Sequence, residues 1–220
     1  MGGVGAYPGT FDPPTVAHLA VAEAALLQGS LSRVDLVLSR RPLGKDPAVP
    51  SFEDRLAVLH AVAAGRSWLG VRVTDRRLIA DVCQGYDAVV MGLDKWHQVV
   101  DPTWYGGSTE ERDRAVASLP TVLLALRDGS PAPQRLPDGV RVLTVPDRHL
   151  PVSSSLARAG RVEWMAEEAA RFDAETGAWS DPGRYSRWSA SGRGAGGAVN
   201  RAATPTSLSP MPGRTEPPEE

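Results

Sequence analysis

Cysteine is nearly absent from this sequence of 220 residues, which contains only Cys83. A single cysteine excludes an intrachain disulfide framework and a zinc site made of cysteines alone, and it fits a reducing compartment. Long apolar runs are also missing, because none reaches the roughly 18 residues that a membrane-spanning helix needs. The N-terminus does not resemble a signal peptide, since Gly9–Pro14 would interrupt its apolar part. We therefore expect a soluble, cytoplasmic protein with no membrane partner.

An excess of positive charge is lacking as well. The 24 Lys and Arg residues are balanced by 26 Asp and Glu residues, which gives a formal net charge of -2. This balance argues against a nucleic-acid partner held by a global positive field. The proportions of hydrophobic residues (42%) and charged residues (23%) are those of an ordinary globular protein. The oligomeric state is left open, a homo-oligomer included.

Large apolar residues become scarce near the C-terminus. From about residue 176 to Glu220 the chain is rich in Gly, Ser, Pro, Ala and Arg. Such a segment buries too little surface to offset the entropy lost on ordering it. The sequence therefore predicts one folded domain over residues 1–175 and a disordered tail over residues 176–220.

Within the predicted domain, short apolar runs alternate with helical patterns. This alternation predicts an α/β fold with a doubly wound, Rossmann-like parallel sheet and helices on both faces. Ligands of such sheets bind at the carboxyl ends of the strands, near the point where the strand order reverses. The expected strands are 4–7, 34–38, 71–74, 88–91, 122–126 and 140–145. The expected helices are 16–28, 51–64, 78–83, 109–118, 153–158 and 162–170.

The most distinctive segment, YPGTFDPPTVAH at residues 7–18, connects the first expected strand to the first expected helix. Gly9 lets the backbone approach a bound group, and Thr10 offers a hydroxyl and an N–H. The positive N-terminal end of the helix suits a phosphate. Thr15 can cap that helix, and His18 lies one turn further on, so that both are candidate ligands of one anion.

This segment resembles the opening motif of the nucleotidylyltransferase, or cytidylyltransferase-like, superfamily: G-x-F-D-P-x-H-x-G-H or its T-x-G-H variant. Gly9–Pro13 matches directly. Thr15 takes the position of the first His or Thr of the motif, His18 matches its second His, and Ala17 replaces the usual glycine. The resemblance implies catalytic roles for Thr10 and His18 and acceptor binding by Asp12. The ATP-binding residues that it implies here are Gly9, Thr10, Phe11, Thr15 and His18.

A second segment, VSSSLAR at residues 152–158, resembles the closing signature of the superfamily, I-S-S-T/S-x-x-R/K. Serine hydroxyls and N–H groups at a helix start can hold the outer phosphates of ATP, and an arginine adds charge. The resemblance assigns this function to Ser153, Ser154, Ser155 and Arg158.

A third region, MGLDKW at residues 91–96 followed by DPTWY at residues 101–105, resembles nicotinate and nicotinamide mononucleotide adenylyltransferases. This resemblance implies that Gly92 and Asp94 help to bind ATP and that Trp104 stacks on the acceptor's pyridine ring. Lys45 resembles the lysine of a loop that covers the phosphates in the same enzymes, which implies both catalysis and acceptor binding.

The resemblance as a whole implies transfer of AMP from ATP to a small phosphorylated acceptor, nicotinate or nicotinamide mononucleotide, with release of pyrophosphate. Such an enzyme would serve NAD biosynthesis and use Mg²⁺ bound mainly through the ATP phosphates, with no protein metal site. Alternatives remain. Thr15 and the opening motif resemble phosphopantetheine adenylyltransferase, and a cytidylyltransferase-type reaction uses the same motifs. Thr15 and Ala17 are also compatible with a catalytically inactive, nucleotide-binding regulator.

Overall fold

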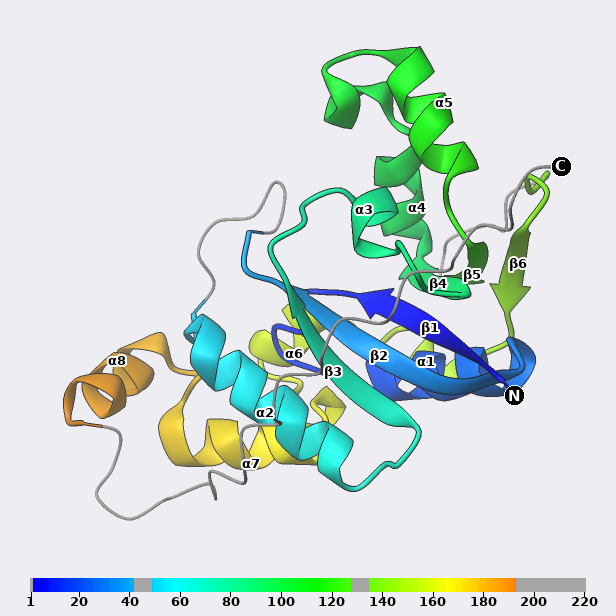
Figure 1. Ribbon diagram of the computed structural model, residues 1–220. Coiled ribbons are helices and arrows are strands. Elements are labelled where there is room, and N and C mark those ends of the chain that lie inside the picture. The colour runs from blue at the N-terminus through cyan, green and yellow to red at the C-terminus, as the bar shows by residue number, and fades with distance from the viewer. Residues whose placement is uncertain (1, 42–48, 128–134, 193–220) are drawn as a thin grey trace, which may run out of the picture.

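The computed structural model describes residues 2–41, 49–127 and 135–192. Its described strands form one parallel sheet of six, in the order β3-β2-β1-β4-β5-β6 (Figure 1). The order reverses between β1 and β4, as in other doubly wound sheets. The predicted α/β fold is confirmed. The strands are β1 (Gly3–Pro8), β2 (Leu31–Ser39), β3 (Leu69–Thr74), β4 (Ala88–Gly92), β5 (Thr121–Ala125) and β6 (Val140–Leu143).

Helices cover both faces of the sheet, because successive strand residues point to opposite faces. On β2, Leu36 and Leu38 pack with α1, α2 and α7, whereas Val37 packs on the other face with α3 and α4. Figure 1 shows these two groups below and above the sheet. None of the described helices combines the length and apolarity needed to cross a bilayer. The helices are α1 (Val16–Gln28), α2 (Phe52–Ala64), α3 (Ile79–Val82), α4 (Leu93–Val100), α5 (Thr109–Ala117), α6 (Ser154–Arg158), α7 (Glu167–Thr176) and α8 (Pro182–Ala190), with the 3-10 turns η1 (Pro102–Tyr105), η2 (Asp147–His149) and η3 (Val162–Trp164).

The expected helix at 162–170 differs from the observed structure. The turn η3 comes first, and α7 begins only at Glu167. Between them, Met165 forms an isolated bridge with Thr15, and Ala166 N donates to the Pro14 carbonyl at 2.9 Å. This contact draws the chain out of helical geometry and ties the end of the domain to the opening loop.

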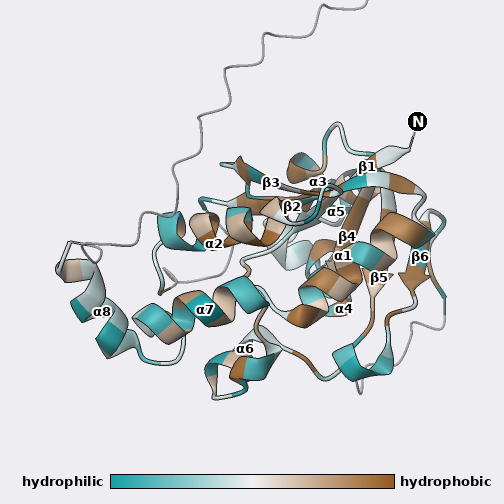
Figure 2. Cartoon of the chain, turned by 90° about the horizontal axis from the view of Figure 1, so that it is seen from below, coloured by the Kyte–Doolittle hydropathy of each residue, from teal (hydrophilic) through white to brown (hydrophobic). Residues whose placement is uncertain are grey.

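The predicted disordered tail, residues 176–220, is wrong for residues 176–192. Helix α8 follows α7, and Trp179 and Tyr185 are buried. The segment folds because a few large aromatic side chains pack together: Phe172 lies edge-on to Trp179, and Trp188 stacks on Tyr185. Figure 2 shows that α8, like α7, is otherwise largely hydrophilic, which explains why average composition misses α8. Residues 193–220 lie outside the described residues.

Candidate active site

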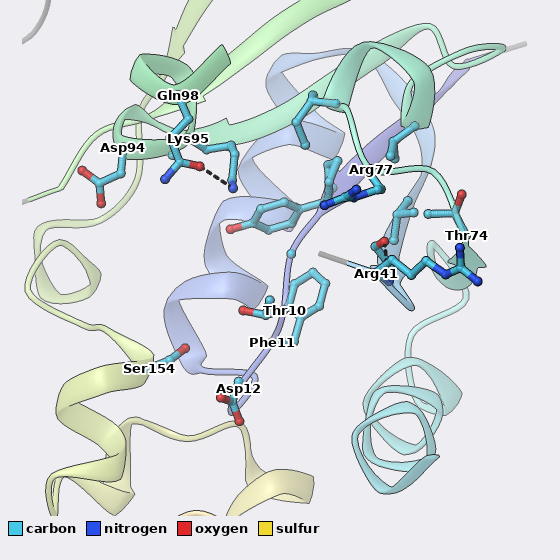
Figure 3. A pocket seen from close by; sticks show the side chains of 18 of the residues that line it. Thr10, Phe11, Asp12, Arg41, Thr74, Arg77, Asp94, Lys95, Gln98 and Ser154 are labelled. Atoms are coloured by element: carbon cyan, nitrogen blue, oxygen red, sulfur yellow. Dashed lines mark hydrogen bonds between the residues drawn. The ribbon is translucent and has the colours of Figure 1, made fainter. Parts of the chain in front are cut away.

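A cleft of about 990 Å³ opens at the carboxyl ends of the strands, where the strand order reverses (Figure 3). It contains residues from all three sequence segments singled out above. Of the predicted site residues, those that line it are Gly9, Thr10, Phe11, Asp12, His18, Gly92, Asp94, Trp104, Ser153, Ser154, Ser155 and Arg158. Thr15 does not line it, and Lys45 lies outside the described residues.

The charge of the cleft is strongly positive. Eight cationic side chains stand against two carboxylates, Asp12 and Asp94, among the described lining residues. In Figure 3, Arg77 lies on the side of the cleft opposite Asp94 and Lys95. Such a cleft suits ligands that carry several negative charges. The cations are Arg40, Arg41, Arg55, Arg76, Arg77, Lys95, Arg127 and Arg158.

The opening loop is organised around the ring of Phe11, which is 1% exposed. Phe11 adopts a left-handed backbone conformation with φ of 46°, and its ring lies edge-on to Tyr7 and His18 at 5.7 and 5.2 Å between centroids. A Cβ on Gly9 would stand 2.8 Å from this ring. Glycine is therefore needed for the packing of Phe11, whereas the sequence suggested that it makes room for a ligand.

Thr15 and His18 form a reciprocal cap at the start of α1. His18 N donates to Thr15 Oγ1 at 3.3 Å, and Thr15 N donates to His18 Nδ1 at 3.0 Å. The hydroxyl of Thr15 also lies 2.8 Å from Nδ1. Because Nδ1 accepts from a backbone N–H, the neutral ring carries its hydrogen on Nε2. Thr15 is buried, contacts the ring of His18 and lines a neighbouring cavity of about 60 Å³ in place of the main cleft.

The closing segment is tied directly to the opening loop. Ser153 caps α6 by accepting from Leu156 N at 3.2 Å, and Ser154 Oγ donates to the Pro13 carbonyl at 2.8 Å. Arg158 donates through Nη1 to the backbone carbonyl of Asp12 and pairs with its carboxylate Oδ2 at 3.4 Å. Two motifs far apart in sequence therefore make one site.

Arg55 supports the same loop from α2. Its Nη1 donates to the Thr10 carbonyl at 3.1 Å, and the side chain is buried. Burial lowers the pKa of Arg55, while the negative charges of Asp12 and Glu53 act in the opposite direction. The guanidinium Nε is buried without a hydrogen-bond partner in the described part of the chain. Arg55 thus places a positive charge, partly offset by the charges of Asp12 and Glu53, next to the opening loop.

The wall formed by β4 and the segment that follows it carries Asp94 and Trp104. Asp94 lies in the first turn of α4, a helix that the sequence did not predict, and pairs with Arg127 at 3.6 Å. Trp104 lies in η1, where Asp101 Oδ1 accepts from Thr103 N at 2.9 Å. Trp104 thus lines the cleft from a short capped turn.

The paired arginines after β2 and β3 were missed by sequence reasoning. In the sheet Ser39 is the register partner of Thr74, so the residues that follow these two strands emerge side by side. Within the described part of the chain, none of the four guanidinium groups pairs with a carboxylate. The signal was a repeated Arg-Arg dipeptide, which follows β2 directly and follows β3 after one residue, Asp75. These residues are Arg40, Arg41, Arg76 and Arg77.

Comparison with known proteins agrees with this geometry. A probable nicotinate-nucleotide adenylyltransferase of Bordetella avium (strain 197N) is 35% identical over 72 residues, which is 33% of this chain and 36% of that relative. The match thus spans about a third of the length of the curated relative. Two structures of Plasmodium falciparum nicotinic acid mononucleotide adenylyltransferase, complexed with APC and with NaAD, superpose with TM-scores of 0.61 and 0.62 at 12% and 13% identity. Both cover 81% of this chain and 98% of the matched chain, and they support the fold.

The cytidylyltransferase-like family model matches residues 6–160, which include the opening loop, the β4 region and the closing segment. This match confirms the resemblance inferred from the motifs. The chain belongs to the cytidylyltransferase-like family.

Proposed function

We propose that this protein transfers the adenylyl group of ATP to nicotinate or nicotinamide mononucleotide and releases pyrophosphate. The observation that carries the proposal is the junction of the two phosphate-binding motifs. Arg158 of the closing segment bonds to Asp12 of the opening loop in a cleft rich in cations. The partial match to a nicotinate-nucleotide adenylyltransferase supports the choice of acceptor.

The reaction needs positioning and charge stabilisation more than proton transfer. An ionised oxygen of the acceptor phosphate attacks the α-phosphorus of ATP. A new P–O bond forms, the bond between the α-phosphorus and the bridging oxygen breaks, and pyrophosphate leaves with that electron pair. Since the nucleophile is already ionised, the site requires no general base.

The side chains divide this work between them. The Nε2–H of His18 and the N–H of Thr10 stabilise the negative charge that builds up on the α-phosphate. Ser153–Ser155 and Arg158 bind the β- and γ-phosphates, which become the leaving group. Lys45, which lies outside the described residues, is proposed to close over the same phosphates. Gly92 and Asp94 contribute to binding of the nucleotide.

The acceptor is proposed to lie between Asp12, Trp104 and the paired arginines after β2 and β3. Trp104 stacks on the pyridine ring, and the guanidinium groups attract the acceptor phosphate. Within the described residues none of these four cations has a carboxylate partner, and four are more than one phosphate needs, which favours an acceptor with a second anionic group. Nicotinate mononucleotide carries a carboxylate where the nicotinamide form has a neutral amide.

The cleft offers few ligands for a metal ion. Its described carboxylates are Asp12 and Asp94, and no group of three His, Cys, Asp or Glu side chains that could hold a metal occurs among the described residues. This fits Mg²⁺ that is bound by phosphate oxygens and water and reaches the cleft with ATP. Bound in that way, the ion would reduce the negative charge of the triphosphate.

The test is pyrophosphate release from ATP and Mg²⁺ with nicotinate mononucleotide, nicotinamide mononucleotide or phosphopantetheine offered separately. We expect release with a pyridine nucleotide and its loss in His18→Ala. The matched control is His60→Ala, because His60 is exposed on α2 and does not line the cleft. Release with phosphopantetheine alone would overturn the acceptor assignment. Binding of ATP without release in any mixture would instead favour the nucleotide-binding regulator.

A further inference from the structure

A tryptophan outside the family motifs contacts a residue of the opening loop. Trp179 is 3% exposed and does not line the cleft. Its indole Nε1–H donates to Asp12 Oδ1 at 2.8 Å. The family model ends at residue 160, so this contact is made by the part of the chain that follows the family match.

The turn that carries Trp179 is fixed by several hydrogen bonds. The carboxylate Oδ1 of Asp173, which is buried in α7, accepts from Trp179 N at 2.6 Å and from Ser180 N at 2.9 Å. Thr176 Oγ1 accepts from Ala178 N at 3.1 Å, and Gly177 ends α7 with a left-handed φ of 74°. The ring also packs edge-on against Phe172. The indole therefore has one well-defined position.

Asp12 is held from two sides. Trp179 donates to Oδ1, while Arg158 pairs with Oδ2 at 3.4 Å. An arginine and a carboxylate would otherwise favour a bidentate pair that uses both oxygens. By occupying Oδ1, the neutral indole keeps the contact between Arg158 and the Asp12 carboxylate to a single, long bond, beside the bond from Arg158 Nη1 to the Asp12 backbone carbonyl. Among the described residues, the other outer nitrogen, Nη2, makes only a long contact with Ser155 Oγ at 3.5 Å, which a phosphate oxygen can replace.

We propose that Trp179 is a positioning residue that orients the Asp12 carboxylate and thereby keeps Arg158 available to the phosphates of ATP. The inference rests on the proposed function, because it assigns Arg158 to ATP. Without the indole, Asp12 turns toward Arg158, takes both of its outer nitrogens and competes with the phosphates. The C-terminal segment with α7 and α8 is then part of the site, although it lies behind the cleft.

The experiment measures the dissociation constant of ATP with Mg²⁺, in the absence of acceptor, for the full chain. Trp179→Phe keeps an aromatic ring and removes the donor, and we expect affinity to fall about threefold to tenfold, the range for one lost hydrogen bond. Trp188→Phe is the matched control, since Trp188 is an aromatic residue of the same segment that stacks on Tyr185 away from Asp12. We expect less than a twofold change in the control.

A double-mutant cycle separates positioning from packing. In the Asp12→Asn background the charge that would capture Arg158 is gone, so Trp179→Phe should have less than a twofold effect. An equal loss of affinity in both backgrounds would show that Trp179 acts by packing alone and would overturn the proposal. Unchanged affinity in Trp179→Phe would overturn it as well while leaving the adenylyltransferase assignment intact. Failure of the unmodified protein to bind ATP would instead refute the proposed function, and this inference with it.

A second measurement covers the case in which Trp179→Phe does not fold. In nuclear magnetic resonance spectra of the Asp12→Asn protein, the indole N–H proton of Trp179 should move upfield, because its charge-assisted hydrogen bond is replaced by a weaker neutral one. An indole resonance at the same position as in the unmodified protein would contradict the contact between Trp179 and Asp12.

Discussion

Replacing Tyr185 by Phe removes one hydroxyl and tests whether α8 is an integral part of the fold. Tyr185 is buried, donates to Asp54 Oδ2 at 2.5 Å and accepts from Ser51 N at 2.9 Å. The substitution removes a hydrogen bond to a carboxylate and deprives a backbone N–H of its acceptor. We expect a loss of about 2–3 kcal/mol in the free energy of unfolding. In a domain of this size, that corresponds to a fall in Tm of roughly 5–10 °C.

The assay is urea denaturation followed by far-ultraviolet circular dichroism, with Ser186→Ala as the control. Ser186 is the next residue of α8 and is exposed, so its substitution should change stability by less than about 0.5 kcal/mol. If Tyr185→Phe were as stable as the unmodified protein within the same margin, the docking of residues 177–192 on α2 would be refuted, and the tail predicted from composition would begin near residue 176 after all.

The same substitution has a pH signature. Burial, followed by the hydrogen bond to Asp54, raises the pKa of Tyr185 above its ordinary value of 10.0. The folded state therefore favours the protonated phenol. Its contribution to stability is complete below pH 10.0 and is lost as the pH rises through the higher pKa of the folded state. The stability difference between the unmodified protein and Tyr185→Phe should shrink above pH 10.0. A growing difference would refute the conclusion that folding raises the pKa of Tyr185.

Three further predictions follow from the site and the core. Arg158→Ala should weaken ATP binding roughly tenfold to a hundredfold, as expected for lost hydrogen bonds to a charged group. The control is Arg171→Ala, because Arg171 is an exposed arginine of α7. Equal affinities of the two variants would refute the assignment of Arg158 to the phosphate site. Thr15→Val keeps the shape of the buried side chain but removes the helix cap, so the free energy of unfolding in urea should fall by about 1 kcal/mol. The value of kcat should fall as well, and an unchanged kcat would refute the role of Thr15 in positioning His18. Burial raises the pKa of Cys83 to about 12, so a thiol reagent at neutral pH should react only after unfolding, and rapid labelling of the native protein would contradict the buried position.

The parts of the fold that the sequence predicts well are those with a strong local pattern. The strands are short apolar runs, and the opening motif combines several residues that constrain one another, such as Gly9 and Phe11. Helix α4 was missed because its buried residues, Leu93, Trp96 and Val99, are separated by polar residues over only eight positions. So short a segment shows less than three turns of periodicity, which is too little to distinguish a helix from a loop.

Other features depend on contacts between distant segments and have no local signature. The average composition after residue 176 suggests disorder, yet Trp179 and Tyr185 each bury a large ring and bond to Asp12 and Asp54. Individual aromatic residues can thus anchor a segment that appears too polar to fold. The two arginine pairs of the cleft likewise become neighbours only because β2 and β3 pair in parallel register.

The geometry of Thr15 and Ala17 bears on whether the protein is an enzyme or an inactive regulator. These residues depart from the usual family motif, and a loss of activity would require them to disturb the phosphate site. The structure places both outside the main cleft, in the wall of the small neighbouring cavity. Thr15 orients His18 through two hydrogen bonds to Nδ1, so the motif histidine retains a defined tautomer. Thr15 thus alters the support of His18 and Ala17 lines the smaller cavity, whereas the groups that we propose to bind the nucleotide line the main cleft, and this favours the enzyme.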